Sequence, residues 1–434
     1  MLERMKGYAL LLNYLLLTVC RDLPLAVYHT LKQRRAAKAA GGAESFGILC
    51  ISHVPWSSAW QRNHHTMYGL SKRHKVVYCF PVVLSRGNLA FLAADGRQRR
   101  DGHGSSGLLV IEPRILPGQR VLPFVRALNR TLLVGALRQA MARMRLGARV
   151  LWFYSPLHEN LAGSLDELLT VYDIQDEYSE YLGRPDYVRE KERRLLRKVE
   201  LVFTGTYALH EDKKQYNGNM HFVGCGVDTA HFGKARDQRA QLPADMAQVV
   251  RPVIGYFGRV CGRMDTDLLA AMADRHPEWS IVLIGDVIVN DFVLAPRPNV
   301  FLLGEKSYSD LPQYVRGFDV CMIPFRLNQL TLKVNPTKLL EYMAAGKPVV
   351  STAIPDMMRF YGDVIDIARN KDEFIVAVEN TLRRNHDGAS DAVNRGIAIA
   401  HGNDWAATIA RMESLIVSDL QRKHGAASEA IRPA

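Results

Sequence analysis

The sequence lacks the motifs of several common protein classes. Its six cysteines show no CxxC pair and no metal-ligand spacing, and most lie in apolar, strand-like runs. Inert core thiols in a reducing compartment are the interpretation that this pattern favours. No GxGxxG follows the first strand expected in either half of the chain, and no GxxxxGK[ST] occurs anywhere. A dinucleotide oxidoreductase and a P-loop NTPase therefore have no support from motifs.

Acidic residues are scarce in the first third of the chain. Residues 1–150 hold 23 Lys and Arg but only 6 Asp and Glu, a balance of +17, while the remainder has a balance of −5. A bias confined to one part of the chain indicates an anionic partner, such as a membrane surface or a phosphate, although general solubility is the plainer explanation. No recognised nucleic-acid-binding fold is apparent, so no nucleic acid is expected as a partner.

Long hydrophobic runs are also missing. The apolar run from Tyr8 to Cys20 has 13 residues, whereas a membrane-spanning helix needs about 20. The run continues into LPLAVYHTL and ends in the basic cluster KQRRAAK. We expect residues 1–44 to form an amphipathic helix that lies in the membrane interface, with its basic residues on lipid head groups. A signal or transmembrane anchor and a helix packed on the folded domain are the alternatives.

From residue 45 onward, short apolar runs alternate with helix-like stretches. Seven such runs precede a polar stretch at 229–248, and six more follow it. Continuous apolar strands alternating with helices predict parallel sheets covered on both faces. We therefore expect an α/β protein with two doubly wound, Rossmann-like domains at 45–235 and 250–385, an interdomain linker between them, and C-terminal helices at 386–434.

The stretch NPTKLLEYMAAGKPVVST (335–352) carries the clearest chemical signal. Pro336 suits the first turn of a helix, which leaves the amides of Thr337 and Lys338 as donors for a diphosphate. Glu341 projects near the same helix end, where its carboxylate could accept hydrogen bonds from a ribose diol. The pattern predicts a nucleotide site; the simpler alternative is a helix start with a solvated glutamate.

This stretch resembles the donor site of the GT-B glycosyltransferases, particularly family 4 and related bacterial polysaccharide enzymes. VIGYFGRVCGRMD (253–265), PNVFLLGEKSYSDLPQYVRGFDVCMIPF (298–325) and VYDIQDEYSEY (171–181) resemble other segments of that family, in the same order. The resemblance covers roughly 45–385 and is most specific over 250–355. It implies two facing Rossmann-like domains, with the nucleotide-sugar held mainly by the second.

The resemblance also implies roles for individual residues. Glu341 corresponds to the second acid of an E-x7-E pattern, the ribose ligand, but Lys333 stands where the first acid is expected. That departure puts the donor sugar in doubt, because a lysine could meet an acidic sugar or reach the diphosphate. Arg259 and Arg263, beside Gly258, would grip the diphosphate and stabilise the leaving group without a metal. Glu305 falls where the family's backbone contacts the base.

The DxD motif at Asp265–Asp267 could chelate a metal, but it begins a predicted helix, where a capping Asp is common. The residues that would orient the acceptor are less clear. His158 follows the strand RVLWFYSP, where related enzymes place residues beside the reacting carbon, and we take it as a catalytic candidate. The other candidates lie near strand ends or on the first helix: His53, Arg62, His64, His65, Glu159, Asp173 and Asp176.

Together these features predict a glycosyltransferase. Retention of anomeric configuration is implied by the resemblance alone. The enzyme would move a sugar from a UDP- or GDP-sugar, with no metal or other cofactor, to a lipid-linked or saccharide acceptor in cell-surface polysaccharide synthesis. The expected location is cytoplasmic, peripheral on the inner face of the cell membrane. The alternatives are a UDP-sugar epimerase of GT-B fold and a noncatalytic, membrane-tethered assembly protein with a decayed donor site.

Overall fold

The computed structural model describes residues 46–58, 60–84, 99–100, 107–147, 149–180, 185–237, 239–288, 292–386 and 391–429. The chain folds into two compact units. Unit 1 comprises residues 1–204, 213–221 and 409–434, and unit 2 comprises residues 205–212 and 222–408. The expected N-terminal amphipathic helix at 1–44 lies outside the described residues.

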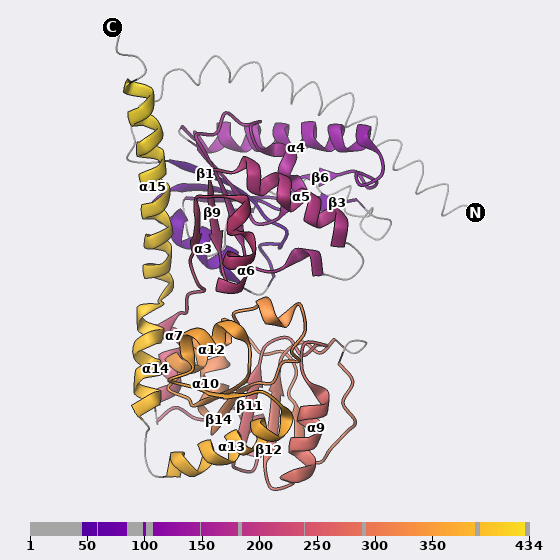
Figure 1. The fold of residues 1–434 in the computed structure, drawn as a ribbon, viewed down its shortest axis with the longest axis vertical. Helices are drawn as coiled ribbons and strands as arrows, with labels where there is room; N and C mark the ends of the chain where they lie inside the picture. Colours follow the sequence, from indigo (N-terminus) through magenta and orange to yellow (C-terminus); the bar gives the residue numbers. More distant parts are fainter. Residues whose placement is uncertain are drawn as a thin grey trace, which may run out of the picture. The chain divides into compact units, whose positions relative to one another are not determined.

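Unit 1 is built on an eight-stranded sheet with the order β10-β9-β8-β7-β1-β2-β5-β4 (Figure 1). Its strands are β1 (Gly47–Ile51), β2 (Lys75–Cys79), β4 (Arg99–Arg100), β5 (Leu108–Ile111), β7 (Arg149–Phe153), β8 (Leu169–Ile174), β9 (Leu201–Thr204) and β10 (Met220–Phe222). The five pairs that join β9, β8, β7, β1, β2 and β5 are parallel, and β4 is antiparallel to its neighbour β5. The central strands β1 and β8 are buried along their whole length and β7 everywhere except at Arg149, as expected for a sheet covered on both faces.

Helices and short 3-10 turns cover this sheet. They are α3 (Arg62–Ser71), α4 (Pro123–Met144), η4 (Pro156–Leu161), η5 (Tyr178–Glu180), α5 (Pro185–Lys198) and η6 (Lys214–Tyr216). The short strands β3 (Val82–Val83) and β6 (Arg114–Ile115) form a separate parallel pair. Pro123 occupies the first turn of α4, where a missing N–H costs no hydrogen bond.

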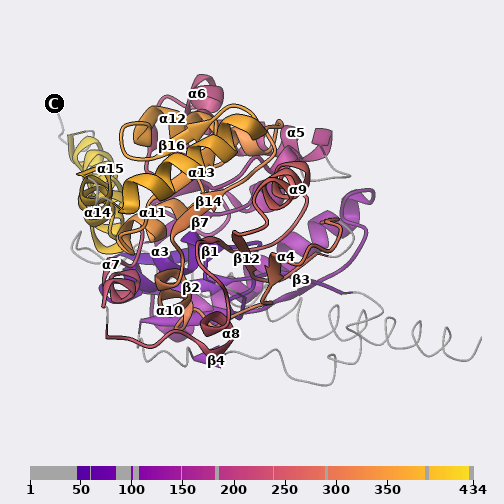
Figure 2. The same cartoon turned by 90° about the horizontal axis from the view of Figure 1, so that it is seen from below.

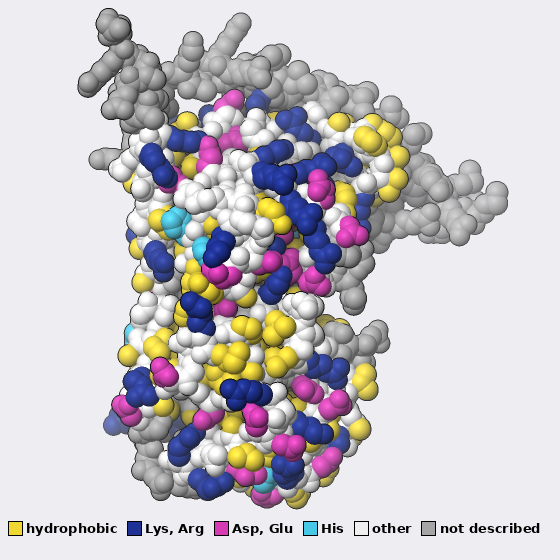
Figure 3. Space-filling model, in the orientation of Figure 1, with side chains coloured by type: hydrophobic (Ala, Val, Ile, Leu, Met, Phe, Trp, Pro, Cys, Tyr) yellow, Lys and Arg dark blue, Asp and Glu magenta, His cyan; other side chains and the backbone are white. Residues whose placement is uncertain are grey.

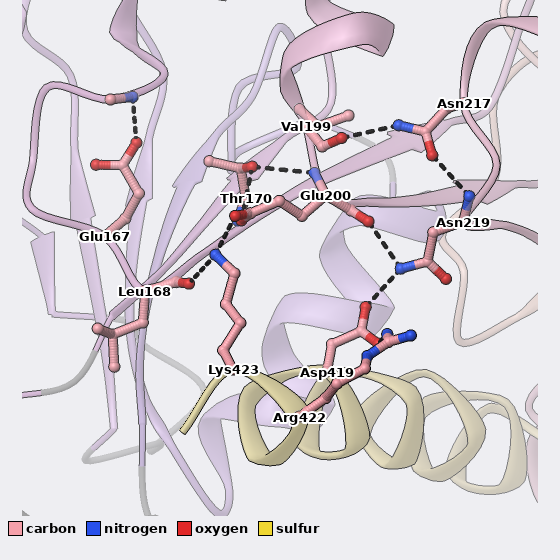
Figure 4. A network of polar contacts seen from close by, with 11 residues as sticks. Glu167, Leu168, Thr170, Val199, Glu200, Asn217, Asn219, Asp419, Arg422 and Lys423 are labelled. Carbon is pink, nitrogen blue, oxygen red and sulfur yellow. Dashed lines mark hydrogen bonds and ion pairs between the residues drawn. The ribbon is translucent and has the colours of Figure 1, made fainter. Parts of the chain in front are cut away.

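The last helix, α15 (Trp405–Glu429), belongs to unit 1 from Ile409 onward. Its apolar side, with Met412, Ile416 and Leu420, is buried. Polar contacts extend this packing (Figure 4): Lys423 donates to the carbonyl of Leu168 at 2.8 Å and pairs with Glu200. Asp419 accepts a hydrogen bond from Asn219 at 2.6 Å, also drawn in Figure 4. The C-terminal segment therefore completes unit 1 although it is remote from it in sequence.

Unit 2 contains a six-stranded parallel sheet with the order β13-β12-β11-β14-β15-β16. The strands are β11 (Val253–Phe257), β12 (Ser280–Ile284), β13 (Val300–Leu302), β14 (Val320–Ile323), β15 (Val349–Thr352) and β16 (Asp366–Ala368). Read in sequence order this is 3-2-1-4-5-6, so the direction of winding reverses between β11 and β14. Ligands of such sheets bind at the carboxyl ends of the strands beside that reversal.

Two helical layers enclose the sheet of unit 2. In Figure 2, α9 (Thr266–Arg275) and α13 (Lys371–His386) lie side by side, and they cover one face. The remaining helical segments of the unit are α6 (Tyr207–Lys213), α7 (Thr229–Gly233), η7 (Lys234–Arg236), α8 (Ala244–Ala247), α10 (Leu311–Arg316), η8 (Thr331–Lys333), α11 (Lys338–Ala344), α12 (Pro355–Tyr361) and α14 (Asp391–Gly402). Of these, α7, α10, α11 and α14 contact one another as a second layer.

The α/β class and the two doubly wound sheets are confirmed, and all thirteen apolar runs form strands. The structure differs from expectation at 229–248, which is no free linker. Phe232, Ala235 and Met246 are buried in the core of unit 2, because apolar residues spaced through this polar stretch pack onto the sheet. Within the described residues, no helix combines the length and apolar character needed to cross a bilayer.

Candidate functional site

Bare backbone lines the carboxyl ends of three adjacent strands in unit 2. Gly258 directly follows β11, and its amide donates to the carbonyl of Ile284 at 2.9 Å. Gly285 follows β12 and donates to the carbonyl of Gly304 at 2.9 Å. Gly258 and Gly285 have φ values of +127° and +144°, and a Cβ on Gly285 would lie 2.0 Å from the oxygen of Gly258. Only glycine is tolerated at these two positions, which we call the glycine corner. No side chain covers their backbone, and they lie near the point between β11 and β14 where the direction of winding reverses.

Lys338, the first residue of α11, reaches into this corner. Its ammonium lies 5.3 Å from the ring centroid of Tyr256 and 5.5 Å from that of Phe325, so it sits over two aromatic faces. A Cβ on Gly258 would approach its Cε to 2.9 Å and its Nζ to 3.2 Å. The glycine therefore makes room for the lysine, and the sheet and α11 together place a cation at the strand ends.

Lys338 and Glu341 lie one helical turn apart on α11, and the charge of each acts on the pKa of the other. Burial raises the pKa of Glu341 to about 7, and the nearby Lys338 charge opposes this shift. Burial likewise lowers the pKa of Lys338 to about 8, against the attraction of Glu341 and with the repulsion of Arg263. Both side chains keep some solvent exposure. A bound ligand with anionic groups and hydroxyl donors would relieve both shifts, because it would solvate both charged forms.

The arginines of the glycine loop differ in position. Arg263 is half-buried, its carbonyl accepts from the amide of Arg326 at 2.8 Å, and its charge acts on Lys338. Arg259 is exposed, and its carbonyl accepts from the hydroxyl of Tyr256 at 3.1 Å. The structure thus brings Gly258, Arg263 and Lys338 together, while the guanidinium of Arg259 lies in solvent.

Other residues expected from the sequence surround α11. Pro336 is buried, and Thr337 is the N-cap of α11, so the helix begins at Lys338, two residues later than expected. Glu305 is exposed after β13. Lys333 donates to the carboxylate of Asp212 on α6 at 3.0 Å. A lysine at this position therefore has an acid within unit 2 that balances its charge.

Tyr308 lies near Glu341 and stacks on His231, and the sequence analysis singled out neither residue. The rings of His231 and Tyr308 stack with centroids 4.4 Å apart, and His231 Nε2 lies 2.8 Å from the Tyr308 carbonyl. Burial raises the pKa of the Tyr308 hydroxyl, and the charge of Glu341 adds to that shift. His231 was overlooked because it falls in the stretch interpreted as a linker. Its aromatic-rich context, TAHFG, was the available signal.

The DxD motif acts as a helix cap. One carboxylate oxygen of Asp265 accepts from the amides of Asp267 and Leu268 at 3.1 and 3.0 Å, at the start of α9. This is the role that aspartate commonly takes at an N-cap. Among the described residues, no group of three or more His, Cys, Asp or Glu side chains is arranged to hold a metal ion.

In unit 1, five of the candidate residues are buried, while His65 and Asp176 are half-buried and His53 is exposed; the buried ones are Arg62, His64, His158, Glu159 and Asp173. The guanidinium of Arg62 pairs with Asp173 at 3.0 Å, and both side chains are almost fully buried. Arg62 is therefore held in the core by this carboxylate and does not lie on the surface. His64 is fixed by the backbone of Gln61 and Pro55, at 3.1 and 3.0 Å.

His158 lies on η4, after β7, close to the winding reversal of the sheet of unit 1. It is 8% exposed, and burial, together with the charge of Lys191, lowers its pKa to about 4. The neighbouring Glu159 accepts from Lys191 at 2.6 Å, and both are buried. His158 is thus a neutral imidazole at physiological pH, able to orient a hydroxyl group but poorly suited to remain protonated.

Comparisons with known proteins support a glycosyltransferase of GT-B type, in agreement with the two doubly wound sheets. Residues 251–384, which include the glycine corner and α11, match the family described as "Glycosyl transferases group 1". Over 275 residues the chain is 26% identical to TuaH of Bacillus subtilis, named as a teichuronic acid biosynthesis glycosyltransferase. The match spans 59% of this chain and 68% of that protein. A sulfoquinovosyl transferase of Arabidopsis thaliana, SQD2, is 29% identical over 31% of this chain and 26% of its own length.

Solved structures share the fold. Sucrose-phosphate synthase from Thermosynechococcus elongatus superposes with a TM-score of 0.66 and 17% identity, over 88% of this chain and 100% of that one. Anabaena HepE in complex with UDP and glucose has a TM-score of 0.63 and 15% identity, over 86% of this chain and 100% of that one. At these identities the likeness extends to the architecture alone.

Proposed function

We propose that this enzyme transfers a sugar from a UDP- or GDP-sugar to a lipid-linked or saccharide acceptor during synthesis of a cell-surface polysaccharide. The similarity to TuaH, named for teichuronic acid biosynthesis, supports the polymer class. A neighbouring fold that binds UDP and glucose supports the donor class. Retention of anomeric configuration and action at the cytoplasmic face of the membrane are parts of the same proposal.

The observation that carries the proposal is the Lys338–Glu341 pair at the glycine corner. Lys338 and Arg263 supply two positive charges where a diphosphate can approach the bare backbone after β11. Such charges stabilise the nucleoside diphosphate as it leaves, so no metal ion is needed in this scheme. The amides of Thr337 and Lys338 would add donors, and Arg259 would reach the diphosphate from solvent. The carboxylate of Glu341 would accept from the ribose hydroxyls.

On the acceptor side, His158 is the proposed orienting group. Its neutral ring, held among buried charges, can accept a hydrogen bond from an acceptor hydroxyl. A retaining mechanism requires no strong general base in this position, so the low basicity of His158 is compatible with the proposal. A UDP-sugar epimerase would require acid and base groups acting on the donor alone.

The ribose contact can be tested by removing either partner. Nucleotide affinity is measured by calorimetry with UDP, GDP and the 2′,3′-dideoxy form of whichever binds. Glu341→Ala should weaken binding of the ribonucleotide about 10- to 100-fold, the usual effect of losing a charge-assisted hydrogen bond. For the dideoxy form, the same substitution should change affinity little, because the hydroxyl partners are already gone.

Glu278→Gln, an exposed glutamate of unit 2, serves as the matched control and should leave both affinities unchanged. Equal losses for the two nucleotides in Glu341→Ala would reject the ribose assignment. A parent protein that binds neither UDP nor GDP would support the noncatalytic alternative. Mass spectrometry of products formed from the donor alone distinguishes an epimerase, which would alter the free sugar nucleotide, from a transferase.

A further inference from the structure

Unit 1 displays large apolar side chains at the start of α4. Val121, Leu122 and Phe124 are 81%, 42% and 67% exposed, and we call these three residues the α4 tip. In Figure 3, hydrophobic side chains gather at this end of α4, with a band of Lys and Arg side chains beside them over α5. Contiguous exposed apolar side chains rimmed by charge mark interaction surfaces more often than scattered single ones do.

Hydrogen bonds of Asn129 and Gly118 fix the backbone around the α4 tip. Asn129 of α4 is buried, accepts from the amide of Leu116 at 2.8 Å, and donates to the carbonyl of Leu116 at 2.9 Å. The turn before α4 closes through Gly118, with φ of +90°, whose carbonyl accepts from the amides of Val121 and Leu122 at 3.0 Å. The exposed side chains are therefore presented by a fixed backbone, and their exposure is a property of the fold.

Basic side chains predominate around the α4 tip. From residue 113 to residue 158 the sequence contains eight arginines and no lysine, aspartate or glutamate. Arg120 is exposed and lies 6.0 Å from the ring centroid of Tyr187 on α5, and Arg126 also acts on that tyrosine. The nearby carboxylate of Asp186 is itself paired with Arg189 at 3.6 Å. Anionic groups are thus the complementary partner of this surface.

We propose that the α4 tip and its flanking arginines dock this enzyme on an anionic lipid bilayer. Three apolar side chains would enter the interface while Arg120 and Arg126 contact phosphate head groups, a combination typical of surface-bound proteins. This rests on the proposed function in its form with a lipid-linked acceptor, and deepens it by naming the face of unit 1 that meets the membrane. It does not depend on residues 1–44.

Binding of the full chain to vesicles tests the surface. The vesicles contain either phosphatidylcholine alone or phosphatidylcholine mixed with phosphatidylglycerol, and binding is measured by co-sedimentation. Replacing Phe124 and Val121 by serine should lower affinity for the anionic vesicles roughly ten-fold. Arg120→Gln with Arg126→Gln should lower it about five-fold per arginine. In unit 2, Val293→Ser with Arg383→Gln is the control, because it removes one exposed apolar side chain and one exposed arginine, at 77% and 72% exposure, away from the α4 tip.

Amide hydrogen exchange, measured on the full chain, identifies which segment contacts the lipid. Anionic vesicles should slow amide exchange in peptides covering 117–128, and the serine variant should lose that protection. Vesicle binding that leaves 117–128 unprotected would overturn the proposal, as would variants that bind like the parent. Protection that grows with protein concentration without lipid would instead indicate a contact between copies and would also overturn it. Calorimetry of nucleotide binding, performed on the same variants, reports separately on the proposed donor site.

Discussion

Lys333 and Asp212 form an ion pair of 3.0 Å within unit 2, at the position where the resembling family carries an acid. The two side chains are 26% and 49% exposed, so water screens their attraction. The charge reversal at 333 is therefore accompanied by a carboxylate on α6, rather than leaving a lone cation near α11. The pair contributes little to stability, so a functional role for Lys333 can be measured separately.

Replacement of Lys333 by alanine should change the free energy of unfolding by less than about 1 kcal/mol, because the ion pair is exposed. If Lys333 contacts the donor, the KM for the nucleotide-sugar should rise several-fold in the same variant. Urea unfolding and donor kinetics measure the two effects. Arg275→Ala, which breaks the exposed pair with Asp372 in the same unit, provides the control. A Lys333→Ala enzyme with unaltered donor kinetics would remove Lys333 from the site.

Donor affinity should depend on pH through Glu341 and Lys338. The pKa of Glu341 is raised to about 7, so the carboxylate that accepts from ribose is lost as pH falls below that value. The pKa of Lys338 is lowered to about 8, so its positive charge is lost as pH rises further. Affinity for UDP-glucose, whose diphosphate does not titrate in this range, should be greatest between about pH 7 and 8. Calorimetry across pH 5.5–9.5 measures this.

In the Glu341→Gln variant the loss of affinity at acid pH should disappear, because the amide does not ionise. The loss at alkaline pH, which comes from Lys338, should remain but move to lower pH, because the Glu341 charge that raises the pKa of Lys338 is gone. A profile that is flat in the parent would contradict the assignment of either group to ligand binding.

Replacing the glycines of the glycine corner by alanine should reduce stability to different degrees. Gly258→Ala should destabilise unit 2 by about 1–3 kcal/mol through its unfavourable φ, and should weaken nucleotide binding because the new Cβ displaces Lys338. Gly285→Ala should be more destabilising, since its Cβ would meet the Gly258 carbonyl at 2.0 Å, and backbone cannot move aside easily.

Gly304→Ala is the matched control for these substitutions. Its φ is also positive, at +70°, but a Cβ there would meet nothing within 4 Å. Urea denaturation and UDP binding should show a small stability loss and normal affinity. Full affinity in Gly258→Ala would show that the position of Lys338 is unimportant for the nucleotide.

His158 should stay neutral throughout the physiological range. Burial lowers the pKa of its imidazole to about 4, so NMR should show no protonation between pH 5.5 and 9. His158→Gln should lower kcat without moving the pH dependence above pH 5, because the parent imidazole has no proton to lose there. An acid limb near pH 6–7 that vanishes only in this variant would assign the limb to His158 and contradict its buried, neutral state.

Local sequence patterns were sufficient to predict the strands of this fold. Runs such as SIVLIGD and KPVVST are continuous and apolar because parallel strands are buried on both faces, and they became β12 and β15. The glycine after VIGYF and the Lys-x-x-Glu spacing of α11 were equally visible, since helical periodicity places residues three apart on one face. The sequence alone therefore determined the fold class, the strands and the segment in which we propose the donor site.

Tertiary structure decided which of these residues meet. The approach of Lys338 to Gly258 joins positions 80 residues apart, and no local pattern encodes the rings of Tyr256 and Phe325 beneath the ammonium. Packing also drew the apparent linker into unit 2, where His231 stacks on Tyr308. Helix and strand preferences act over a few neighbouring residues, whereas burial, electrostatic coupling and the exposure of the α4 tip depend on contacts between distant segments. Those long-range contacts exist only once the chain has folded.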